Sequence, residues 1–424
     1  MLQEVWLVLT VAAATAVAVV PSPPTMIKQP KQEQLYQVSQ SQDEPDKPFA
    51  LECEAQGNPE PTYQWTKNNK EFDHVSYDNR ISQQPHRGTL LFNKPDDVDE
   101  GLYQCRATNV HGTSVSNAVF LRKSGKTRIT LPPESHEVAA GKSSTFRCGA
   151  EADPSLELKI TWLFNGEPID PELDARMQVS DNSLTITRTM ELDSGTYTCL
   201  AQTELDDDRA SATLIVLDVP NAPQIVHVEC EPVTALVEWR PTGDRRAPIL
   251  SYSIQYNTSF TPDIWEDAFV NIPAPETKFK VSLSPWANYT FRVVARNKIG
   301  SSPPSTPFGY CKTLEDVPHK NPDRVSGRGD RSDNLVISWE PMSPIEHNAP
   351  GFFYKVLWKR DDLPDASWNS RIIEDWRQHS HVVYDQPPCK PYRIKVEAYN
   401  RRGQAHTAAY EVLGHSGEDE EGCQ

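Results

Sequence analysis

The sequence lacks any surplus of positive charge. Its 424 residues include 42 Lys and Arg against 59 Asp and Glu, a formal net charge of −17. Nucleic-acid binding needs a clustered basic surface, so this balance argues against nucleic acid as a partner. The acidity instead favours a soluble extracellular surface. The 36 prolines are more than helices tolerate, because proline removes a backbone donor and clashes inside a helix. We therefore expect strands and turns to dominate.

Sequence motifs of enzymes are also missing. No Gly-rich phosphate loop, Walker lysine or Cys-x-x-Cys pair occurs. His379 and His381 are spaced to share one strand face and could seat a metal, but no third ligand is apparent, which favours ordinary exposed strand residues. The acidic run ELDDD (204–208) lacks calcium-ligand spacing and is expected to be a solvated turn. We predict no enzyme activity, no metal, no cofactor and no small-molecule substrate.

Only one stretch is long and apolar, VWLVLTVAAATAVAVV at 5–20. It has the length of a signal-peptide core and is too short for a comfortable membrane span. AVA at 16–18 offers a small-x-small cleavage site, although the preceding MLQE has no Lys or Arg. We predict a signal peptide at 1–18, with an uncleaved N-terminal anchor as the alternative. Export would make the protein extracellular or secreted, or part of the plasma-membrane surface if the chain belongs to a longer receptor.

The first half of the chain carries one constellation twice. Cys53 and Cys105 enclose Trp65, and the second cysteine ends DEGLYQC, with Tyr103 two positions before it. In immunoglobulin-like sandwiches the two cysteines bridge facing sheets, the tryptophan packs on the bridge, and the tyrosine hydroxyl bonds to the backbone at a corner. The second copy consists of Cys148, Trp162, and DSGTYTC ending at Cys199. These patterns predict two disulfides and two I-set immunoglobulin-like domains, at 26–122 and 127–217.

The second half keeps the tryptophan and the tyrosine corner but loses the bridging cysteines. Trp239 lies in ALVEWRP and Tyr289 in LSPWANYTFRVVARNKIG; Trp339 lies in LVISWEP and Tyr392 in PYRIKVEAYNRRG. This pattern is typical of fibronectin type III sandwiches, in which apolar packing replaces the core disulfide. We place these domains at 219–314 and 318–414, followed by an acidic tail at 415–424. The predicted fold class is all-β, a tandem of four β-sandwiches.

Four further cysteines lie outside the immunoglobulin patterns. Cys230 follows the first strand segment of the third domain and Cys311 lies on its last, near the same pole, so we predict a disulfide between them. Cys389 should lie on the E–F loop of the fourth domain and Cys423 in the tail. An intradomain bridge, free thiols and an interchain bridge all remain open for this pair.

Two kinds of short motif add candidate sites. Asn257 and Asn288 begin N-x-S/T sequons in the third domain, which predict glycans unless the sequons are unused. Asn288 should face outward because its neighbour Tyr289 faces the core. The triplet Arg328-Gly329-Asp330, in SGRGDRSDN, matches the integrin-recognition tripeptide. We expect it at the end of strand A or in the A–B turn of the fourth domain, as a solvated turn, with integrin binding as the alternative.

Long stretches of the chain resemble the neuroglian and neurofascin family of neural adhesion proteins. FALECEAQGNPEPTYQWTKNNKEFD resembles the family's first immunoglobulin domain, and HEVAAGKSSTFRCGAEADPSLELKITWLFNGEPID its last. NLVISWEPMSPIEHNAPGFFYKVLWKRDD resembles the second fibronectin domain of neuroglian. The family carries six immunoglobulin domains, so the resemblance implies that the first runs through SGKT directly into a counterpart of the sixth. The horseshoe that family members form from the first four domains for homophilic adhesion could not then form as usual.

The resemblance implies an extracellular recognition protein. It would mediate cell–cell contact and axon guidance in neural development by binding cell-surface adhesion proteins of the same family, homophilically or heterophilically, with integrin as a further candidate partner. Two alternatives come from other classes of protein. One is a soluble decoy or guidance ligand that modulates full-length neuroglian-like receptors. The other is the ectodomain of a signalling receptor.

Overall fold

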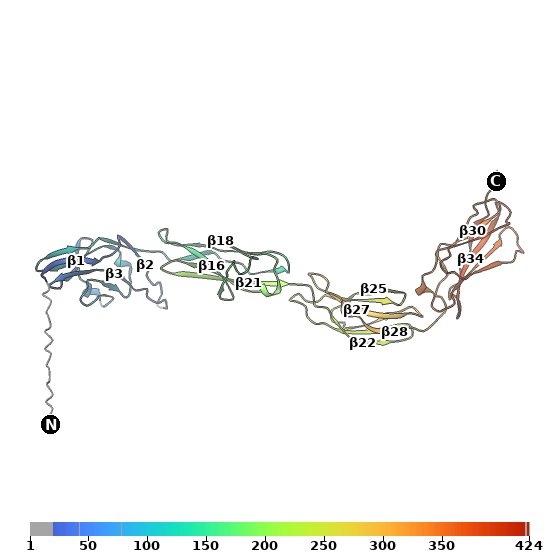
Figure 1. Cartoon of the computed structure of the whole chain (residues 1–424), viewed down its shortest axis with the longest axis horizontal. Helices are drawn as coiled ribbons and strands as arrows, with labels where there is room; N and C mark the ends of the chain where they lie inside the picture. Colours follow the sequence, from blue (N-terminus) through green and yellow to red (C-terminus); the bar gives the residue numbers. More distant parts are fainter. Residues whose placement is uncertain (1–19, 42, 78, 420–421, 424) are drawn as a thin grey trace, which may run out of the picture. The chain divides into compact units, whose positions relative to one another are not determined.

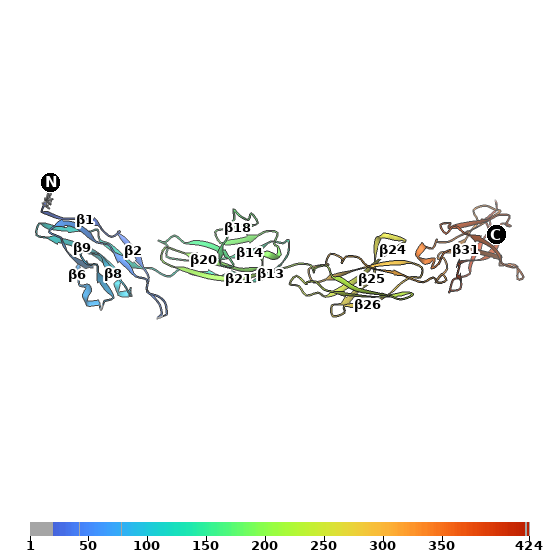
Figure 2. The same ribbon diagram turned by 60° about the horizontal axis from the view of Figure 1, so that its bottom comes forward.

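The computed structural model describes residues 20–41, 43–77, 79–419 and 422–423. The predicted signal peptide at 1–18 lies outside these residues. Strands dominate, and they build four β-sandwiches in chain order, coloured from blue to red in Figure 1. Figure 2 shows the same strands after a rotation. The predicted all-β fold of tandem sandwiches is confirmed.

The first sandwich has a three-stranded sheet β3-β8-β7, a pair β1-β4, and a sheet β2-β11-β9-β5-β6 in which β10 also pairs with β9. β1 begins upstream of the predicted start at residue 26, because Pro23 and Pro24 lie on an edge strand, where a missing N–H costs no ladder bond. The elements are β1 (Ser22–Lys28), β2 (Glu33–Tyr36), β3 (Phe49–Leu51), β4 (Glu54–Asn58), β5 (Thr62–Lys67), β6 (Lys70–Phe72), β7 (Ile81–Gln83), β8 (Leu90–Phe92), β9 (Gly101–Asn109), β10 (Gly112–Val115) and β11 (Val119–Lys123), with 3-10 turns at His74–Tyr77 and Asp97–Asp99.

The corner before the second cysteine of the first sandwich is held by buried polar contacts. The Tyr103 hydroxyl donates to the backbone oxygen of Asp99 at 2.8 Å. The Asp99 carboxylate, 1% exposed, pairs with the Arg80 guanidinium at 2.5 and 2.7 Å and accepts from the Asp96 N–H at 2.8 Å. A buried carboxylate is tolerated only when it is paired and hydrogen-bonded in this way. The DEGLYQC motif is therefore a fully satisfied structural corner.

The second sandwich repeats this plan with sheets β13-β21-β20-β16-β17 and β14-β19-β18 and a pair β12-β15. Its residues 137–142, 189–194 and 215–217 group with the third and fourth sandwiches into one compact unit, and the rest of it groups with the first sandwich. The strands are β12 (Arg128–Leu131), β13 (His136–Ala139), β14 (Ser144–Arg147), β15 (Gly149–Glu151), β16 (Lys159–Phe164), β17 (Glu167–Pro168), β18 (Met177–Ser180), β19 (Ser183–Ile186), β20 (Gly195–Gln202) and β21 (Asp207–Leu217), with a 3-10 turn at Glu191–Asp193.

The third sandwich packs the sheet β22-β23-β26 on the sheet β25-β24-β27-β28. Trp239 and Tyr289 lie in one buried apolar cluster between the sheets, and the Tyr289 hydroxyl accepts from the Ser284 N–H at 2.8 Å. The strands are β22 (Gln224–Cys230), β23 (Thr234–Arg240), β24 (Ser251–Thr258), β25 (Thr261–Pro273), β26 (Lys278–Ser282), β27 (Asn288–Arg296) and β28 (Phe308–Lys312).

The fourth sandwich packs β29-β30-β33 on β32-β31-β34-β35, with β36 also pairing with β34. Trp339 lies in its core, and the Tyr392 hydroxyl donates to the Gln386 side chain at 2.8 Å. The last strand, β36, ends at His415, which is the first residue of the tail predicted from the sequence. The elements are β29 (Ser326–Gly327), β30 (Leu335–Ser338), β31 (Phe353–Arg360), β32 (Asn369–Ile373), β33 (Ser380–Val383), β34 (Pro391–Asn400), β35 (Gly403–Gln404) and β36 (Val412–His415), with a 3-10 turn at Pro344–Glu346.

Candidate interaction site at the junction of the first two domains

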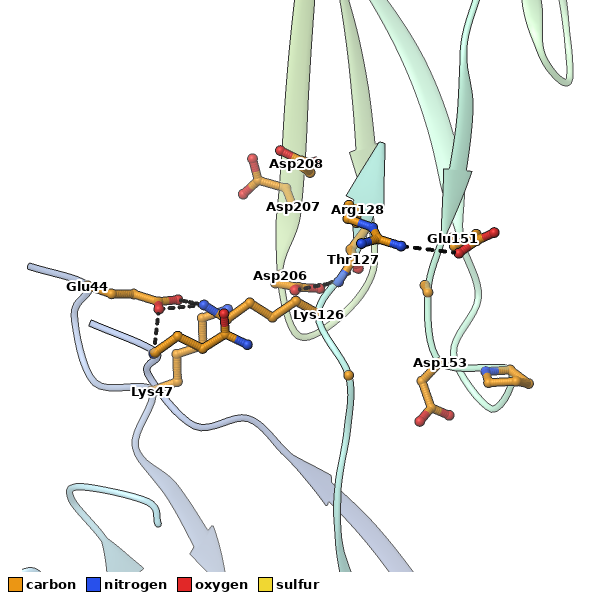
Figure 3. Close-up of a pocket in the computed structure, with 14 residues that line it drawn as sticks. Glu44, Lys47, Lys126, Thr127, Arg128, Glu151, Asp153, Asp206, Asp207 and Asp208 are labelled. Carbon is orange, nitrogen blue, oxygen red and sulfur yellow. Dashed lines mark hydrogen bonds and ion pairs between the residues drawn. The ribbon is translucent and has the colours of Figure 1, made fainter. Parts of the chain in front are cut away.

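The first two sandwiches meet at an open polar cleft of about 720 Å³. Figure 3 shows its charged side chains, which come from the loop after β2, from the linker and the start of β12, from the end of β15 and the loop after it, and from the hairpin between β20 and β21. The lining residues are Gln40, Glu44, Lys47, Gly125, Lys126, Thr127, Arg128, Glu151, Ala152, Asp153, Pro154, Asp206, Asp207 and Asp208.

The linker at this junction is fixed by carboxylates of the β20–β21 hairpin. Asp206 accepts hydrogen bonds from the Thr127 N–H at 2.8 Å and from the Thr127 hydroxyl at 2.5 Å. Asp208 accepts from the Ile129 N–H at 2.7 Å. Burial raises the pKa of Asp206, but the hydrogen bonds from Thr127 and Thr203 outweigh this effect and hold the pKa below its ordinary value. The acidic run is therefore more than the solvated turn that the sequence suggested.

Arg122, on β11, clamps the two domains together. Its guanidinium binds Asp153 of the second domain through two parallel contacts of 2.8 and 3.1 Å and reaches the Ser155 hydroxyl at 2.5 Å. Its Nε also donates to Glu33 at 2.8 Å. Bidentate pairing between arginine and a carboxylate adds geometric specificity to the attraction. This clamp ties the last strand of the first domain to the second domain.

The clamp also sets how the junction responds to acid. Hydrogen bonds from Arg122 and Ser155 hold the pKa of Asp153 well below its usual range. A carboxyl group whose pKa is lowered on folding adds stability above its unfolded-state pKa, and this stability is lost only as the pH falls through the lowered folded-state pKa. The Arg122–Asp153 pair should therefore stay closed under mildly acidic conditions.

Two lysines complete the cleft. Lys126 of the linker pairs with Glu44, and this contact lowers the pKa of the Glu44 carboxyl. Lys47 donates to the Gln37 side chain at 2.7 Å and to the Leu205 backbone oxygen at 3.2 Å. Among the residues that the structure describes, no group of three or more His, Cys, Asp or Glu side chains is arranged to hold a metal ion. The cleft is thus a polar joint that presents mixed charge to solvent.

All eight cysteines are paired in the structure. Cys53–Cys105 and Cys148–Cys199 join fully buried residues, each with a Cα–Cα distance of 6.4 Å. The other two bonds are Cys230–Cys311, at 5.5 Å, and Cys389–Cys423, at 5.3 Å. The structure thus shows the intradomain arrangement among the three that the sequence left open for Cys389 and Cys423. Sequence spacing could not choose between them, because it does not give the position of the tail.

The two sequons lie on one face of one sheet. In β24 and β27 the side chains of Asn257 and Asn288 alternate with buried neighbours, Thr258 and Tyr289, so both asparagines face away from the core. Asn257 lies directly opposite Thr290, in the same strand as Asn288. Glycosylation of both asparagines remains a prediction, and glycans here would cover this face of the third domain.

The triplet at 328–330 lies between β29 and β30 and is tied to the end of the chain. Arg328 and Asp330 are exposed, but the Gly329 N–H donates to the His415 backbone oxygen at 2.9 Å. A Cβ at Gly329 would lie 2.0 Å from the backbone nitrogen of Gly417, so only glycine fits. Asn334 donates to the Asp330 carboxylate at 2.6 Å. The segment is an anchored turn at the edge of the fourth sandwich.

The histidine pair of the sequence analysis separates in the structure. His379 is exposed, whereas His381 lies on β33 with its ring centroid 5.8 Å from that of Trp358. Burial, together with nearby Arg371, lowers the pKa of His381. The two histidines therefore have different surroundings, one in solvent and one against an aromatic ring. None of the helices in the described part of the chain is long and apolar enough to cross a bilayer.

Comparison with known families agrees with the observed sandwiches. Residues 30–109 match the immunoglobulin domain family, residues 127–216 the immunoglobulin I-set domain family, and residues 221–309 the fibronectin type III domain family. The chain is therefore a tandem array of immunoglobulin-like and fibronectin type III modules.

Relatives identify the family more closely. Neuroglian of Drosophila melanogaster is 48% identical over 370 residues, which cover 87% of this chain and 28% of neuroglian. The neuronal cell adhesion molecule of Gallus gallus is 33% identical, covering 88% of this chain and 29% of that protein. Neurofascin of Gallus gallus is 34% identical, covering 87% and 27%. The chain belongs to the neuroglian and neurofascin family of neural immunoglobulin-superfamily cell-adhesion molecules. It spans less than a third of the length of these relatives.

Proposed function

We propose that this chain is an extracellular recognition module that mediates cell–cell contact in neural tissue, including axon guidance, by binding proteins and not by catalysis. The observation that carries the proposal is its membership of a family of neural adhesion molecules across 87% of its length. The four disulfide bonds are typical of proteins in an oxidising, extracellular compartment. The partners are cell-surface adhesion proteins of the same family, bound homophilically or heterophilically.

The polar junction of the first two domains supports this role. The Arg122–Asp153 clamp and the contacts of Asp206 fix the linker, so the charged surface around it is presented in one arrangement. A preorganised surface binds with a smaller loss of conformational entropy than a mobile one. We propose this junction as part of the surface that meets the protein partner.

Bead and cell binding test the adhesion proposal. Beads coated with the purified chain should cluster, or should bind cells that display a full-length neuroglian-family protein. The Asp153→Asn variant should weaken that binding, because it removes the charge that Arg122 clamps. Glu157→Gln, a charge-matched change on an exposed residue of the same loop region, is the control. Beads that neither cluster nor bind such cells would refute the adhesion role.

Integrin binding through residues 328–330 is a secondary proposal. The exposed side chains of Arg328 and Asp330 favour it, whereas the packing of Gly329 against Gly417 keeps the triplet from extending as a free loop. Attachment of integrin-bearing cells to the immobilised chain should then fall on Asp330→Glu, with the unfolding temperature unchanged. If integrin-bearing cells attached equally to the wild-type chain and to the Asp330→Glu variant, the triplet would have only its structural role in the turn.

A further inference from the structure

The outer face of one sheet in the fourth domain gathers basic and aromatic side chains. Tyr354 and Val356 of β31 point into the core, so the alternate residues Lys355 and Lys359 point outward. In β34 the outward positions are Arg393, Lys395, Glu397 and Tyr399. The register places Lys359 directly opposite Arg393 and Leu357 opposite Lys395. We call Lys355, Lys359, Trp368, Arg393 and Lys395 the Trp368 face.

The indole of Trp368 holds two of these cations in place. The Lys359 ammonium lies 5.0 Å from the ring centroid and the Lys395 ammonium lies 5.1 Å from it. Cations are attracted to the face of an aromatic ring at such distances. Two positive charges on one ring also repel each other, and an anion placed between them would relieve that repulsion.

The pairing of charges on this face is incomplete. Lys395 pairs with Glu397 at 2.9 Å, and Arg393 pairs with Asp361 at 2.5 Å and Glu411 at 3.4 Å. Lys355 lies directly opposite Glu397, whose carboxylate pairs with Lys395, and no ion pair of Lys355 or Lys359 is found among the described residues. Like charges directly across a sheet, such as Lys359 and Arg393, destabilise it. The four cations of the face are thus met by three carboxylates, which leaves an excess of positive charge in a chain whose net charge is −17.

The equivalent face of the third domain differs in its glycosylation sequons. There the outward positions of β24 and β27 include the two sequon asparagines, Asn257 and Asn288. Residues 318–414 contain no N-x-S/T sequon, so no N-linked glycan would cover the Trp368 face. The two neighbouring domains thus share a fold, but the predicted glycans would cover this sheet face in the third domain and leave it open to a charged ligand in the fourth.

We propose that the Trp368 face binds a linear sulfated polysaccharide of the glycosaminoglycan class. The face holds ammonium groups on two neighbouring strands, Lys355 and Lys359 on β31 and Lys395 on β34, and several cations on one surface suit a polymer with repeated sulfates. Lysine serves such ligands as a point charge, and ammonium groups already positioned by Trp368 need little further ordering on binding. The interaction is electrostatic and weakens as salt rises. It does not depend on the protein partner proposed above.

A heparin-binding measurement on the full chain tests this proposal. The immobilised probe is a heparin dodecasaccharide, and hyaluronan, which has carboxylates but no sulfate, is the comparison ligand. The wild-type chain should bind heparin at about 0.15 M salt and lose it as salt rises. Lys355→Gln with Lys359→Gln should weaken binding about tenfold, because two unpaired cations are removed.

A matched double variant controls for net charge. Lys278→Gln with Lys312→Gln removes two exposed lysines from the third domain and should leave heparin binding unchanged. Lys278 and Lys312 are exposed, whereas Lys355 and Lys359 are half-buried, so the unfolding temperatures of all three proteins are measured to show that each variant remains folded. Absence of heparin binding, or equal weakening in both double variants, would overturn the proposal. Binding of poly-glutamate as tightly as heparin would instead assign the face to an acidic protein.

Discussion

The immunoglobulin-like and fibronectin-like domains use disulfides in opposite ways. Cys53, Cys105, Cys148 and Cys199 are all fully buried, and each bond lies inside the core beside a tryptophan. In the third domain Cys311 is buried but Cys230 is exposed, and in the fourth domain neither partner is in the core. The first kind of sandwich builds its core around the bond. The second fills its core with apolar side chains and uses the bond to tie chain segments together at one pole.

The largest expected effect comes from removing a core bond. Replacing Cys53 and Cys105 by alanine removes a native cross-link, which costs about 2–5 kcal/mol, and leaves a cavity beside Trp65. Because a domain has only about 5–15 kcal/mol of stability, we expect the first domain to unfold in a large fraction of molecules. Hydrogen exchange by mass spectrometry should show lost protection in β5 and β9, with protection of the third and fourth domains unchanged. If β9 kept full protection in this variant, the core of the first domain would not depend on its disulfide, which would contradict the contrast between the two kinds of domain.

Next in size is the corner beside that bond. Asp99→Asn keeps the shape of the side chain but leaves the Arg80 charge without its carboxylate, and breaking a buried ion pair costs about 3–5 kcal/mol. Urea unfolding followed by exchange in β9 should shift to lower urea concentration. Asp97→Asn, a carboxylate two residues away that is largely exposed, should have little effect. Equal shifts for both variants would mean that burial of the pair is unimportant.

A smaller loss is expected for the third domain. Cys230→Ser removes a cross-link that closes 81 residues, which costs about 2–4 kcal/mol through the entropy of the unfolded chain. It leaves no cavity, because Cys230 is exposed and Cys311 keeps its place in the core as a thiol. The unfolding temperature of the third domain should fall while its near-ultraviolet circular dichroism stays native. A loss of that signal would show that the bond is part of the core after all.

The smallest effect is expected in the fourth domain. Cys423→Ser frees only the segment after β36, and the tail gains conformational entropy in the folded state as well as in the unfolded state. The unfolding temperature should therefore change by no more than about 1–2 °C, equivalent to a few tenths of a kcal/mol. Exchange should rise only in peptides beyond residue 415. If the unfolding temperature fell as far as it does for Cys230→Ser, the tail would contribute to the stability of the fourth domain.

Much of this architecture could be predicted from the residues. The Cys-Trp-Tyr constellations define the immunoglobulin corners because each member has a local task, and the alternation of apolar residues in β27 and β34 is a property of single strands. Asn288 could be oriented from its neighbour Tyr289 for the same reason. Such signals are short in range, so they are readable without knowing which strands meet.

Contacts between distant segments could not be predicted in this way. The roles of Asp206 and Asp208 at the linker depend on how two domains meet, and the ELDDD run looked like a simple turn. The Trp368 face depends on the register of β31 against β34 and on a tryptophan from the loop before β32. No periodicity within one strand encodes that register.

The sequence by itself therefore determined the kind and order of the four sandwiches and the inward or outward direction of many strand residues. Tertiary structure decided that Cys423 of the tail pairs with Cys389, how the triplet at 328–330 is anchored by Gly417, and where the cations gather. The physical reason is that alternation and corner motifs act over a few residues, whereas disulfide geometry, close backbone approach and charge clustering depend on distances between segments far apart in the chain.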